Sequence, residues 1–500
     1  MLLLIRVKPA QGKGDLRRSY ALTPEGRRGA MRTVTWKVQI WLAVSTLAMA
    51  LGGTGVPDAQ VVAQDPGVRG GSAGAGRPIA GLTASQGHFF DVGKVEFGAV
   101  EGVADGLGPR MNLDSCGGCH SQPASGGTSP FRNPQFDFTS VPGGDQRPFF
   151  ITQNGPVREA RFKFKPDGKT LDGGVHNTAT ITGRAGATGC SLAQPDFAAQ
   201  AANNNLIFRI PTPVFGAGLI EQIPDSVILA NQGANAGTKQ QFGIHGHANL
   251  NVSGRTITGS TNSNGNDGTI TRFGWKAQNQ TLLLFSGEAY NVEMGISNEL
   301  FQQEREQAPN CQFATVPNDV TDTDVTTTPA GLNAIEKFAF FQRFLAPPTP
   351  VTTSFTTTTG FSVSNGSITS GANTFTSVGC ALCHMPTLTT GNSTVAALSN
   401  QHADLFSDLL VHGMGPGLAD NIIQGGAQGD EFRTAPLWGL GQRIFFLHDG
   451  RTTDLIQAIQ AHKSVGNTTF GPSEANAVID NFNQLNEQQK QNLLNFLRSL

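Results

Sequence analysis

The sequence predicts a mainly α-helical protein with two domains, the first enlarged by an irregular insertion that contains some β-strand. Two observations lead to this prediction. The pattern Cys-x-x-Cys-His occurs twice, as CGGCH at 116–120 and as CALCH at 380–384, which indicates two units of one kind. The stretch 121–266 between them is rich in Gly, Pro, Asn and Thr with short apolar patches, so we expect loops and short strands there.

The N-terminal region carries the pattern of an export signal. Residues 38–50 (VQIWLAVSTLAMA) form an apolar run that follows Arg32 and Lys37 and ends in small residues, as secretory signal peptides do. At about 13 residues the run is too short to span a bilayer, and no later stretch is long enough. We therefore expect 1–59 to be a signal peptide with an upstream extension. The mature chain is expected to be periplasmic or secreted, without a membrane span.

The charge of the chain excludes one class of partner. Residues 1–59 hold nine of the 35 basic and three of the 37 acidic residues, so the remainder has 26 basic against 34 acidic residues, a formal charge of −8. An acidic surface repels the phosphate backbone of nucleic acid. Nucleic acid is therefore not expected as a partner.

Polar and glycine-rich runs predict the domain boundaries. Residues 60–81 include the run PGVRGGSAGAGR, which predicts a flexible linker. The first domain is then expected at 82–328, where the polar, Pro-bearing run DVTDTDVTTTP closes it. The second domain is expected at 329–500.

Two segments of the second domain have clear helical periodicity. Apolar residues recur at helical spacing in 331–345 (GLNAIEKFAFFQRFL), and Pro347 and Pro348 follow directly. The last helix is expected at 487–500, where the apolar residues lie mostly on one face and Asn486 is a suitable N-cap.

Each Cys-x-x-Cys-His segment has the residues that covalent haem attachment needs. Cysteines three apart on one helical turn can form thioethers with both vinyl groups of haem, and the adjacent histidine reaches the iron. We therefore predict two covalently bound haem c groups, with His120 and His384 as iron ligands and with thioethers at Cys116, Cys119, Cys380 and Cys383.

Zinc, a redox dithiol and structural disulfides are weaker interpretations of these segments. Zinc would need further ligands, and no second Cys pair lies near either motif. A thioredoxin-like dithiol needs a βαβ setting, and neither motif follows a convincing strand. The two other cysteines, Cys190 and Cys311, are expected to form a structural disulfide, as is common in an oxidising compartment.

A haem bound by one histidine has a sixth position, whose occupant separates electron transfer from chemistry at the iron. Near the second motif the candidates are His462, Met414, His412 and His448. For the first haem, a histidine of the inserted region could cap the iron, but a single histidine in a loop is usually an ordinary residue. The histidines in question are His176, His245 and His247.

Several segments resemble a known family. The segments FRTAPLWGLGQRIFFLHDGRTTDLIQAIQAH (432–462), DLLVHGMGPGLAD (408–420) and RFGWKA (272–277) are similar to the dihaem oxidoreductases of the bacterial cytochrome c peroxidase superfamily. The branch often labelled thiol oxidoreductase is the most similar. The resemblance runs from about Gly106 to the C-terminus. It implies two cytochrome c-like haem domains, of which the first carries the insertion.

The resemblance also implies the sixth ligand of the second haem. In the peroxidases of this family this ligand is usually a methionine 14 residues after the histidine of an HDG motif, and here His448 plus 14 is His462. The chain thus departs from the family pattern, and the second haem is expected to be bis-histidine, with Met414 as the alternative. A bis-histidine haem has a lower potential than a His/Met haem.

Further roles follow from the same resemblance. Trp275 of FGWKA matches the tryptophan that lies between the two haems in the peroxidases, although a core residue would look the same. Glu293 of VEMG matches the acid that moves the peroxide proton, with Glu288 as an alternative. Three arginines near the second haem are expected to pair with its propionates: Arg433, Arg443 and Arg451.

The function that the resemblance implies is a periplasmic, peroxidase-like dihaem oxidoreductase. Electrons would come from a small donor protein, a cytochrome or cupredoxin, and pass from the C-terminal haem to a reactive N-terminal haem. Hydrogen peroxide or another small oxidant would react there. Two alternatives stay open: a dihaem relay with no substrate at the iron, and an oxidase of thiol or protein substrates. Relatives hold a calcium ion between the domains, and the sequence leaves this open.

Overall fold

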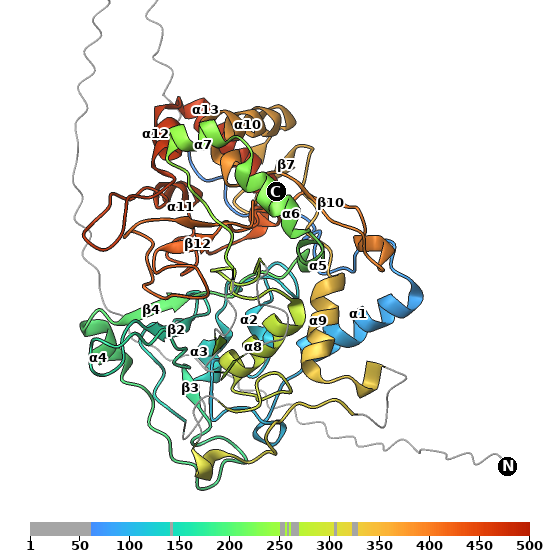
Figure 1. Ribbon diagram of the computed structural model, residues 1–500, viewed down its shortest axis with the longest axis vertical. Coiled ribbons are helices and arrows are strands. Elements are labelled where there is room, and N and C mark those ends of the chain that lie inside the picture. The colour runs from blue at the N-terminus through green and yellow to red at the C-terminus, as the bar shows by residue number, and fades with distance from the viewer. Residues whose placement is uncertain are drawn as a thin grey trace, which may run out of the picture. The chain divides into compact units, whose positions relative to one another are not determined.

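Helices provide most of the regular structure in the computed structural model (Figure 1). The structure describes residues 62–500 except for 141–143, 251–255, 258–259, 262–269, 305–307 and 323–328. The predicted export signal therefore lies outside the described residues. Within them, no helix has the length and apolar content needed to cross a membrane.

Thirteen α-helices occur in the described residues: α1 (Ala84–Phe97), α2 (Cys116–Cys119), α3 (Pro134–Phe138), α4 (Phe197–Ala202), α5 (Ala217–Glu221), α6 (Asp225–Gly233), α7 (Ala236–Phe242), α8 (Leu282–Met294), α9 (Ala334–Phe344), α10 (Asn365–Val378), α11 (Leu455–Gln460), α12 (Asn476–Gln484) and α13 (Glu487–Ser499). The predicted helices at 331–345 and 487–500 are confirmed as α9 and α13. Both begin at a capping box, of Asn333 with Glu336 and of Asn486 with Gln489.

The described strands pair in antiparallel sheets of two. The longest pair, β2 (Glu159–Phe162) with β4 (Leu206–Arg209), lies in the predicted insertion. The other pairs are β1 (Arg110–Met111) with β3 (Ala179–Thr180), β5 (Thr256–Ile257) with β6 (Ser260–Thr261), β7 (Phe355–Thr356) with β8 (Ser362–Val363), β9 (Leu388–Thr389) with β10 (His402–Ala403), and β11 (Val411–Gly413) with β12 (Glu431–Arg433). The fold is mainly helical, as predicted, with strands concentrated outside the helix pairs.

Two helix pairs support the two motifs, and each crosses at a glycine. α1 packs on α9, where a Cβ at Gly93 would lie 2.3 Å from the Lys337 carbonyl oxygen. α10 packs on α13, where a Cβ at Gly371 would lie 2.0 Å from the Asn492 carbonyl oxygen. Only glycine allows the two backbones to approach this closely. Figure 1 shows α9 beside α1 and α10 beside α13.

The predicted boundary at 329 does not match the packing. The described residues of 62–500 form one compact unit, and α9, which was expected in the second domain, packs on α1 and α8 beside the first motif. Conversely, α7, which lies in the insertion of the predicted first domain, packs on α12 of the predicted second domain. Polarity in the sequence marks a connection, but it does not show whether that connection separates two domains.

Residues 62–81 are packed, although their composition predicts a flexible linker. The Arg69 side chain is 2% exposed and donates to the Ser499 carbonyl oxygen at 3.3 Å. The Asp65 carboxylate pairs with the buried Arg498 guanidinium at 2.6 Å, and Ala63 N donates to Glu487. The glycines make sharp turns possible here, and the few charged residues between them fix the segment to α13. The Cys190–Cys311 disulfide is also present, which confirms that prediction.

The Asp65–Arg498 pair gives a test of this packing. Asp65→Ala leaves a buried guanidinium without its carboxylate, and the free energy of unfolding should fall by about 3–5 kcal/mol. Arg132→Ala removes one partner of an exposed ion pair with Asp137 and should change it by less than about 1 kcal/mol. Urea unfolding of the two haem-loaded variants measures the difference. Equal stability of both variants would mean that 62–81 is not fixed to α13.

Candidate functional site

Helix α2 holds the first motif. The Ser115 side chain caps the helix by accepting from Gly118 N at 3.2 Å. A Cβ at Gly118 would lie 2.3 Å from the Leu113 side chain, so the glycines of CGGCH let the turn lie flat on its neighbours. His120 follows the helix, and its Nδ1 lies 2.9 Å from the Gly127 carbonyl oxygen.

The second motif begins where α10 ends. Gly379 takes a positive φ of 104°, which stops α10 and starts the short turn Cys380–Leu382. His384 follows, and its Nδ1 lies 3.0 Å from the Phe406 carbonyl oxygen. Both motifs therefore place two cysteines on one turn, with a histidine directly behind it.

Each motif opens into its own cavity. The first cavity, of about 930 Å³, is lined by Cys116, Cys119 and His120. The second, of about 1450 Å³, is lined by Cys380, Cys383 and His384 together with many apolar side chains.

The histidines of both motifs are prepared to bind a metal through Nε2. Burial lowers the pKa of His120 and of His384 to about 4, so both imidazoles are neutral at pH 7. In each ring a proton on Nδ1, donated to the carbonyl oxygen, makes Nε2 the nitrogen that can bind a metal. The residues therefore fit the haem that the sequence predicts at each motif.

His462 lies in the second cavity, as predicted from its spacing to His448. It follows α11, and its Nδ1 lies 2.8 Å from the Ala458 carbonyl oxygen, so it has the same arrangement as His384. Burial lowers its pKa. Met414 also lines this cavity. The two remain as the predicted ligand and its alternative.

The other two histidines of the second cavity are less suited to binding iron. Both ring nitrogens of His412 face carboxylates, Nε2 at 3.0 Å from Asp408 and Nδ1 at 2.8 Å from Glu474. The His448 ring stacks on Phe432, with 4.3 Å between the ring centroids. His412 therefore has no nitrogen free for a metal.

Two buried arginines lie without an anion at the second cavity. Burial lowers the pKa of Arg433 and of Arg443 to about 10. In the described part of the chain, Arg433 Nε and Arg443 Nη2 have no hydrogen-bond partner. Both side chains also line a smaller cavity of about 480 Å³ that borders Trp275. Such guanidinium groups fit the propionates of a haem.

Arg451, the third predicted arginine, lies away from the residues that line the second cavity. Its Nε donates to Asp449 at 2.7 Å, its side chain is 39% exposed, and it is not among the residues that line the second cavity. The HDG turn explains this, because Asp449 lies two residues away and takes the guanidinium to the surface.

Trp275 borders all three cavities. Its ring lines the first cavity, the smaller one and the second. The indole Nε1 donates to the Ile210 carbonyl oxygen at 2.9 Å, and the ring meets His448 edge to face at 6.4 Å. The Trp275 side chain thus lines both the cavity of the first motif and the cavity of the second.

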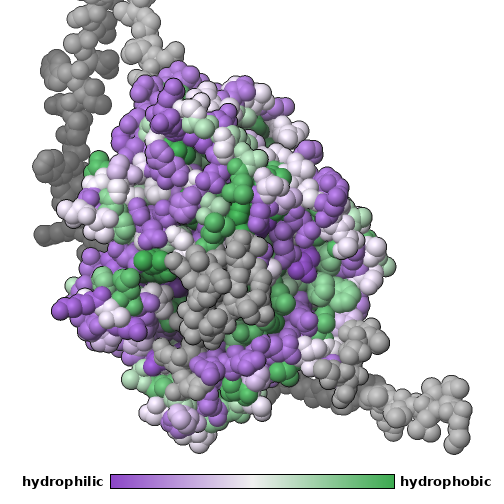
Figure 2. Space-filling model, viewed as in Figure 1, coloured by the Kyte–Doolittle hydropathy of each residue, from purple (hydrophilic) through white to green (hydrophobic). Residues whose placement is uncertain are grey.

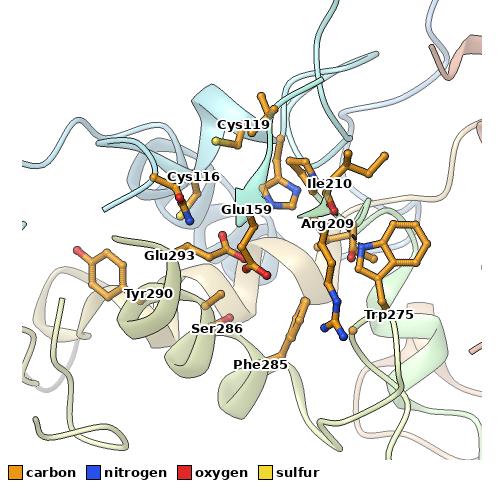
Figure 3. A pocket seen from close by; sticks show the side chains of 18 of the residues that line it. Cys116, Cys119, Glu159, Arg209, Ile210, Trp275, Phe285, Ser286, Tyr290 and Glu293 are labelled. Atoms are coloured by element: carbon orange, nitrogen blue, oxygen red, sulfur yellow. Dashed lines mark hydrogen bonds between the residues drawn. The ribbon is translucent and has the colours of Figure 1, made fainter. Parts of the chain in front are cut away.

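Glu293 lies in the first cavity on α8, and Figure 3 shows its carboxylate directed toward that of Glu159. Burial, and then the charge of Glu159, raise the pKa of Glu293 to about 8, and the Arg161 guanidinium opposes this. The alternative acid Glu288 does not line the cavity, because its carboxylate accepts from the Asn279 amide. Glu293 is therefore the carboxyl group of α8 that faces the first motif.

The sequence analysis missed a buried charged network beside this cavity. Asp420 is 1% exposed and pairs with Arg209 at 2.6 Å and with Lys276 at 3.1 Å. Burial acts to raise the pKa of Asp420, but the two cations lower it overall. Lys276 and Asp420 belong to the segments RFGWKA and DLLVHGMGPGLAD, so the resemblance contained them. No local pattern connects Arg209 to Asp420, which lies 211 positions later.

Two candidates from the insertion lie elsewhere. His176 pairs with Asp172 at 2.8 Å and stacks on Phe162, and His247 pairs with Glu431 at 3.0 Å. None of His176, His245 and His247 lines the first or the second cavity. The described residues include one group of three close metal-ligating side chains, Cys383, Asp408 and His412. Its thiol and imidazole are not the oxygen ligands that calcium prefers.

Two buried cavities, each with a Cys-x-x-Cys-His segment and a neutral imidazole, define a protein built around two haem groups. The family model described as "Di-haem oxidoreductase, putative peroxidase" matches residues 199–500, and the chain belongs to this family. This confirms the predicted resemblance. Comparison with curated protein sequences gave no match.

Two solved structures are similar in part. The hydrazine synthase of Kuenenia stuttgartiensis shares 16% identity, with a TM-score of 0.22, over 43% of this chain and 60% of that chain. This chain therefore covers less than two thirds of the synthase chain. A MauG-like protein associated with microbial copper homeostasis shares 18% identity, with a TM-score of 0.26, over 58% of this chain and 90% of that chain.

The position of His462 gives a test of the second haem. His462→Ala should convert that haem from low spin to high spin, because its sixth ligand is lost, whereas Met414→Leu should leave the spin state unchanged. His462→Met should raise the reduction potential of the same haem. Absorption and electron paramagnetic resonance spectra of the purified variants, with a redox titration, measure both effects. A high-spin second haem in Met414→Leu would assign the ligand to the methionine instead.

Proposed function

We propose that the chain is a periplasmic, peroxidase-like dihaem c-type oxidoreductase. Electrons from a small cytochrome or cupredoxin enter at the C-terminal haem and pass to a reactive N-terminal haem, where hydrogen peroxide or another small oxidant is reduced. The family supports an oxidoreductase with two haem groups. The predicted export signal and the Cys190–Cys311 disulfide agree with an oxidising compartment.

The observation that carries this proposal is the difference between the two cavities. The second offers a further neutral imidazole, His462, and the Met414 thioether. Among the described residues that line the first, His120 is the one imidazole, and no methionine is present. A haem with two strong ligands transfers electrons, and one with an open position reacts with a substrate.

Glu293 gives the open side of the first site a group that can move a proton. Haem iron held by His120 would supply the binding position and the electrons for cleaving the O–O bond of a peroxide. The Glu293 carboxylate would take a proton from one peroxide oxygen and return it to the other, the leaving oxygen. Its pKa of about 8 is close to neutral pH, so both protonation states are accessible. Arg161, held by Glu159 and the Gly173 carbonyl oxygen, keeps positive charge nearby.

The Trp275 side chain supports the proposed direction of electron flow. Its hydrogen bond to Ile210 and the close Arg443 guanidinium, 5.7 Å from the ring centroid, keep the indole in one orientation between the two sites. Arg433 N also donates to the Trp275 carbonyl oxygen at 2.9 Å. An aromatic ring fixed in this way shortens the path between the two haem groups.

Glu293→Gln tests the proton-transfer role. The amide keeps the shape of the side chain but cannot accept the proton, so peroxide turnover with a reduced cytochrome donor should fall by about 10²–10⁴-fold. Glu288→Gln is the matched control on the same helix, and it should retain turnover. Unchanged turnover in Glu293→Gln would remove this assignment, and two low-spin haems in every redox state of the wild type would favour a relay without substrate.

The pH profile of the wild type tests the same group independently. The carboxylate form is the base, so kcat/KM for peroxide should rise with pH until the pKa of Glu293, about 8, has been passed, and then level off. The rise should be absent in Glu293→Gln. A profile that is flat in the wild type would show that another group moves the proton.

Trp275→Phe tests the path between the sites. The smaller ring loses the indole hydrogen bond and part of the bridge, so electron transfer from the second haem should slow, while the single-turnover reaction of the first site with peroxide stays fast. Trp438→Phe is the control, since Trp438 borders only the smaller cavity. Stopped-flow absorbance separates the two steps. Equal transfer rates in Trp275→Phe and wild type would contradict the role.

A further inference from the structure

A tyrosine with its own carboxylate partner borders the first cavity on the side of the motif. Tyr290 lies on α8, is 4% exposed and lines that cavity. Figure 3 shows its ring near Cys116 and its hydroxyl directed away from Glu293. The hydroxyl is hydrogen-bonded to the Glu101 carboxylate. This tyrosine is not used by the proton transfer at Glu293 or by the path through Trp275.

Glu101 connects Tyr290 to solvent and to the first motif. The Glu101 amide donates to the Asp114 carbonyl oxygen at 2.8 Å, two residues before Cys116. Its side chain is partly exposed, and the preceding Val100 is 70% exposed. The pair therefore joins the buried cavity to the protein surface within a few residues.

The other nearby carboxylates already have partners. Three of them lie close enough to raise the pKa of Glu101. Asp319 accepts from Ala334 N and Ile335 N, Glu96 pairs with Lys337 at 3.2 Å, and Asp105 accepts from Gly102 N at 2.9 Å. Glu101 is therefore the carboxylate placed to take a proton from Tyr290.

The charges favour a neutral tyrosine that passes on its proton only when it is oxidised. Burial, followed by the charges of Glu101 and Asp319, raises the pKa of Tyr290, so the phenol stays protonated at neutral pH. Burial also raises the pKa of Glu101, which makes this carboxylate a better proton acceptor. An oxidised phenol is a strong acid, and it needs such an acceptor within hydrogen-bond distance.

We infer that Tyr290, with Glu101 as its proton acceptor, is a redox-active site that supplies an electron to the first haem when the donor protein does not. This inference rests on the proposed function, because hydrogen peroxide is the oxidant. Reduction of peroxide to two waters takes two electrons and two protons, and both protons come from solvent, because the tyrosine proton stays on Glu101. One electron comes from the haem at the first site and the other from Tyr290, whose O–H proton moves to Glu101. The products at the pair are a neutral tyrosyl radical and a protonated Glu101.

The reverse step restores the pair. An electron from the reduced donor protein returns to the tyrosyl radical, and Glu101 gives back the proton. Because Glu101 is partly exposed, the tyrosyl radical holds the oxidising equivalent near the surface and not at the first haem. Tyr290 thus lies on one side of the first site and Trp275 on the other.

The composition makes the test unusually direct, because the chain has only two tyrosines, Tyr20 and Tyr290. The full haem-loaded protein, reduced by one electron and without donor, is mixed with hydrogen peroxide, frozen and measured by electron paramagnetic resonance. We expect an organic radical signal whose hyperfine structure changes when the protein is grown with ring-deuterated tyrosine. The signal should be lost in Tyr290→Phe and retained in Trp438→Phe, which is the better control because Tyr20 lies in the segment that is expected to be removed on export.

Glu101→Gln separates the proton acceptor from the tyrosine itself. The amide can still accept a hydrogen bond but is not a base, so the radical yield should fall although Tyr290 is present. Haem absorption spectra of each variant check that the fold and the cofactors are intact. A signal that does not respond to deuteration, or that survives in Tyr290→Phe, would overturn the inference.

Peroxide consumption with a reduced donor distinguishes a failure of the Tyr290 inference from a failure of the proposed function. A protein that consumes peroxide but never shows a tyrosyl signal overturns the role of Tyr290 and leaves the proposed function standing. A protein whose haem groups do not react with peroxide overturns both.

Discussion

The structure depends on one repeated interaction, in which a buried imidazole gives its Nδ1 proton to a backbone carbonyl oxygen. It occurs at His120 with Gly127, at His384 with Phe406 and at His462 with Ala458. Burial keeps each ring neutral, and the carbonyl fixes which nitrogen carries the proton. Each Nε2 lone pair is thus available to iron before any haem is bound. The helix pairs and the insertion hold these three rings at their cavities.

The distribution of polar groups then makes the two cavities different. The second is lined mainly by apolar side chains, apart from the histidines, Glu474 and the guanidinium groups of Arg433 and Arg443, each of which has one nitrogen without a hydrogen-bond partner. Charged side chains line the first cavity. Glu293 and Glu159 face each other, and Arg161 and Arg209 lie beside them. An apolar cavity suits a haem that exchanges electrons. A polar one can bind and protonate a small oxidant.

The surface reflects this internal arrangement only weakly. Hydrophilic side chains cover most of the face shown in Figure 2, and the hydrophobic ones lie in small separate groups.

The charged network that supports Trp275 is completely buried, with Lys276 at 0% and Asp420 at 1% exposure. Breaking such a pair leaves a buried charge, which costs about 3–5 kcal/mol. The network therefore holds the segment RFGWKA in place between the two sites.

The sequence predicted the parts of this account that depend on local spacing. Cys-x-x-Cys-His located both cavities, apolar periodicity predicted α9 and α13 with Asn486 as the cap of α13, and the family resemblance implied His462. The prediction was wrong where long-range packing decides. The segment 62–81 is fixed to α13 by Asp65 and Arg498, and α9 packs on α1 rather than with the residues that follow it. No sequence window contains such pairs.

The sequence also did not predict in which direction individual side chains point. Arg433 and Arg451 look alike in the sequence, but one is buried at the second cavity and the other is held at the surface by Asp449. Tyr290 gave no sequence signal at all, because its partner Glu101 lies in a loop nearly two hundred residues away. What such residues do depends on which groups the fold brings next to them.

The central claim is that two haem groups are attached through the two cysteine pairs. Mass spectrometry of the acid-denatured protein, matured in cells that carry the haem attachment machinery, tests it most directly. The account predicts a chain that keeps the mass of two haems, and of one haem when Cys380 and Cys383 are both replaced by alanine. A chain that loses its haem in acid, or that was never coloured, would contradict it.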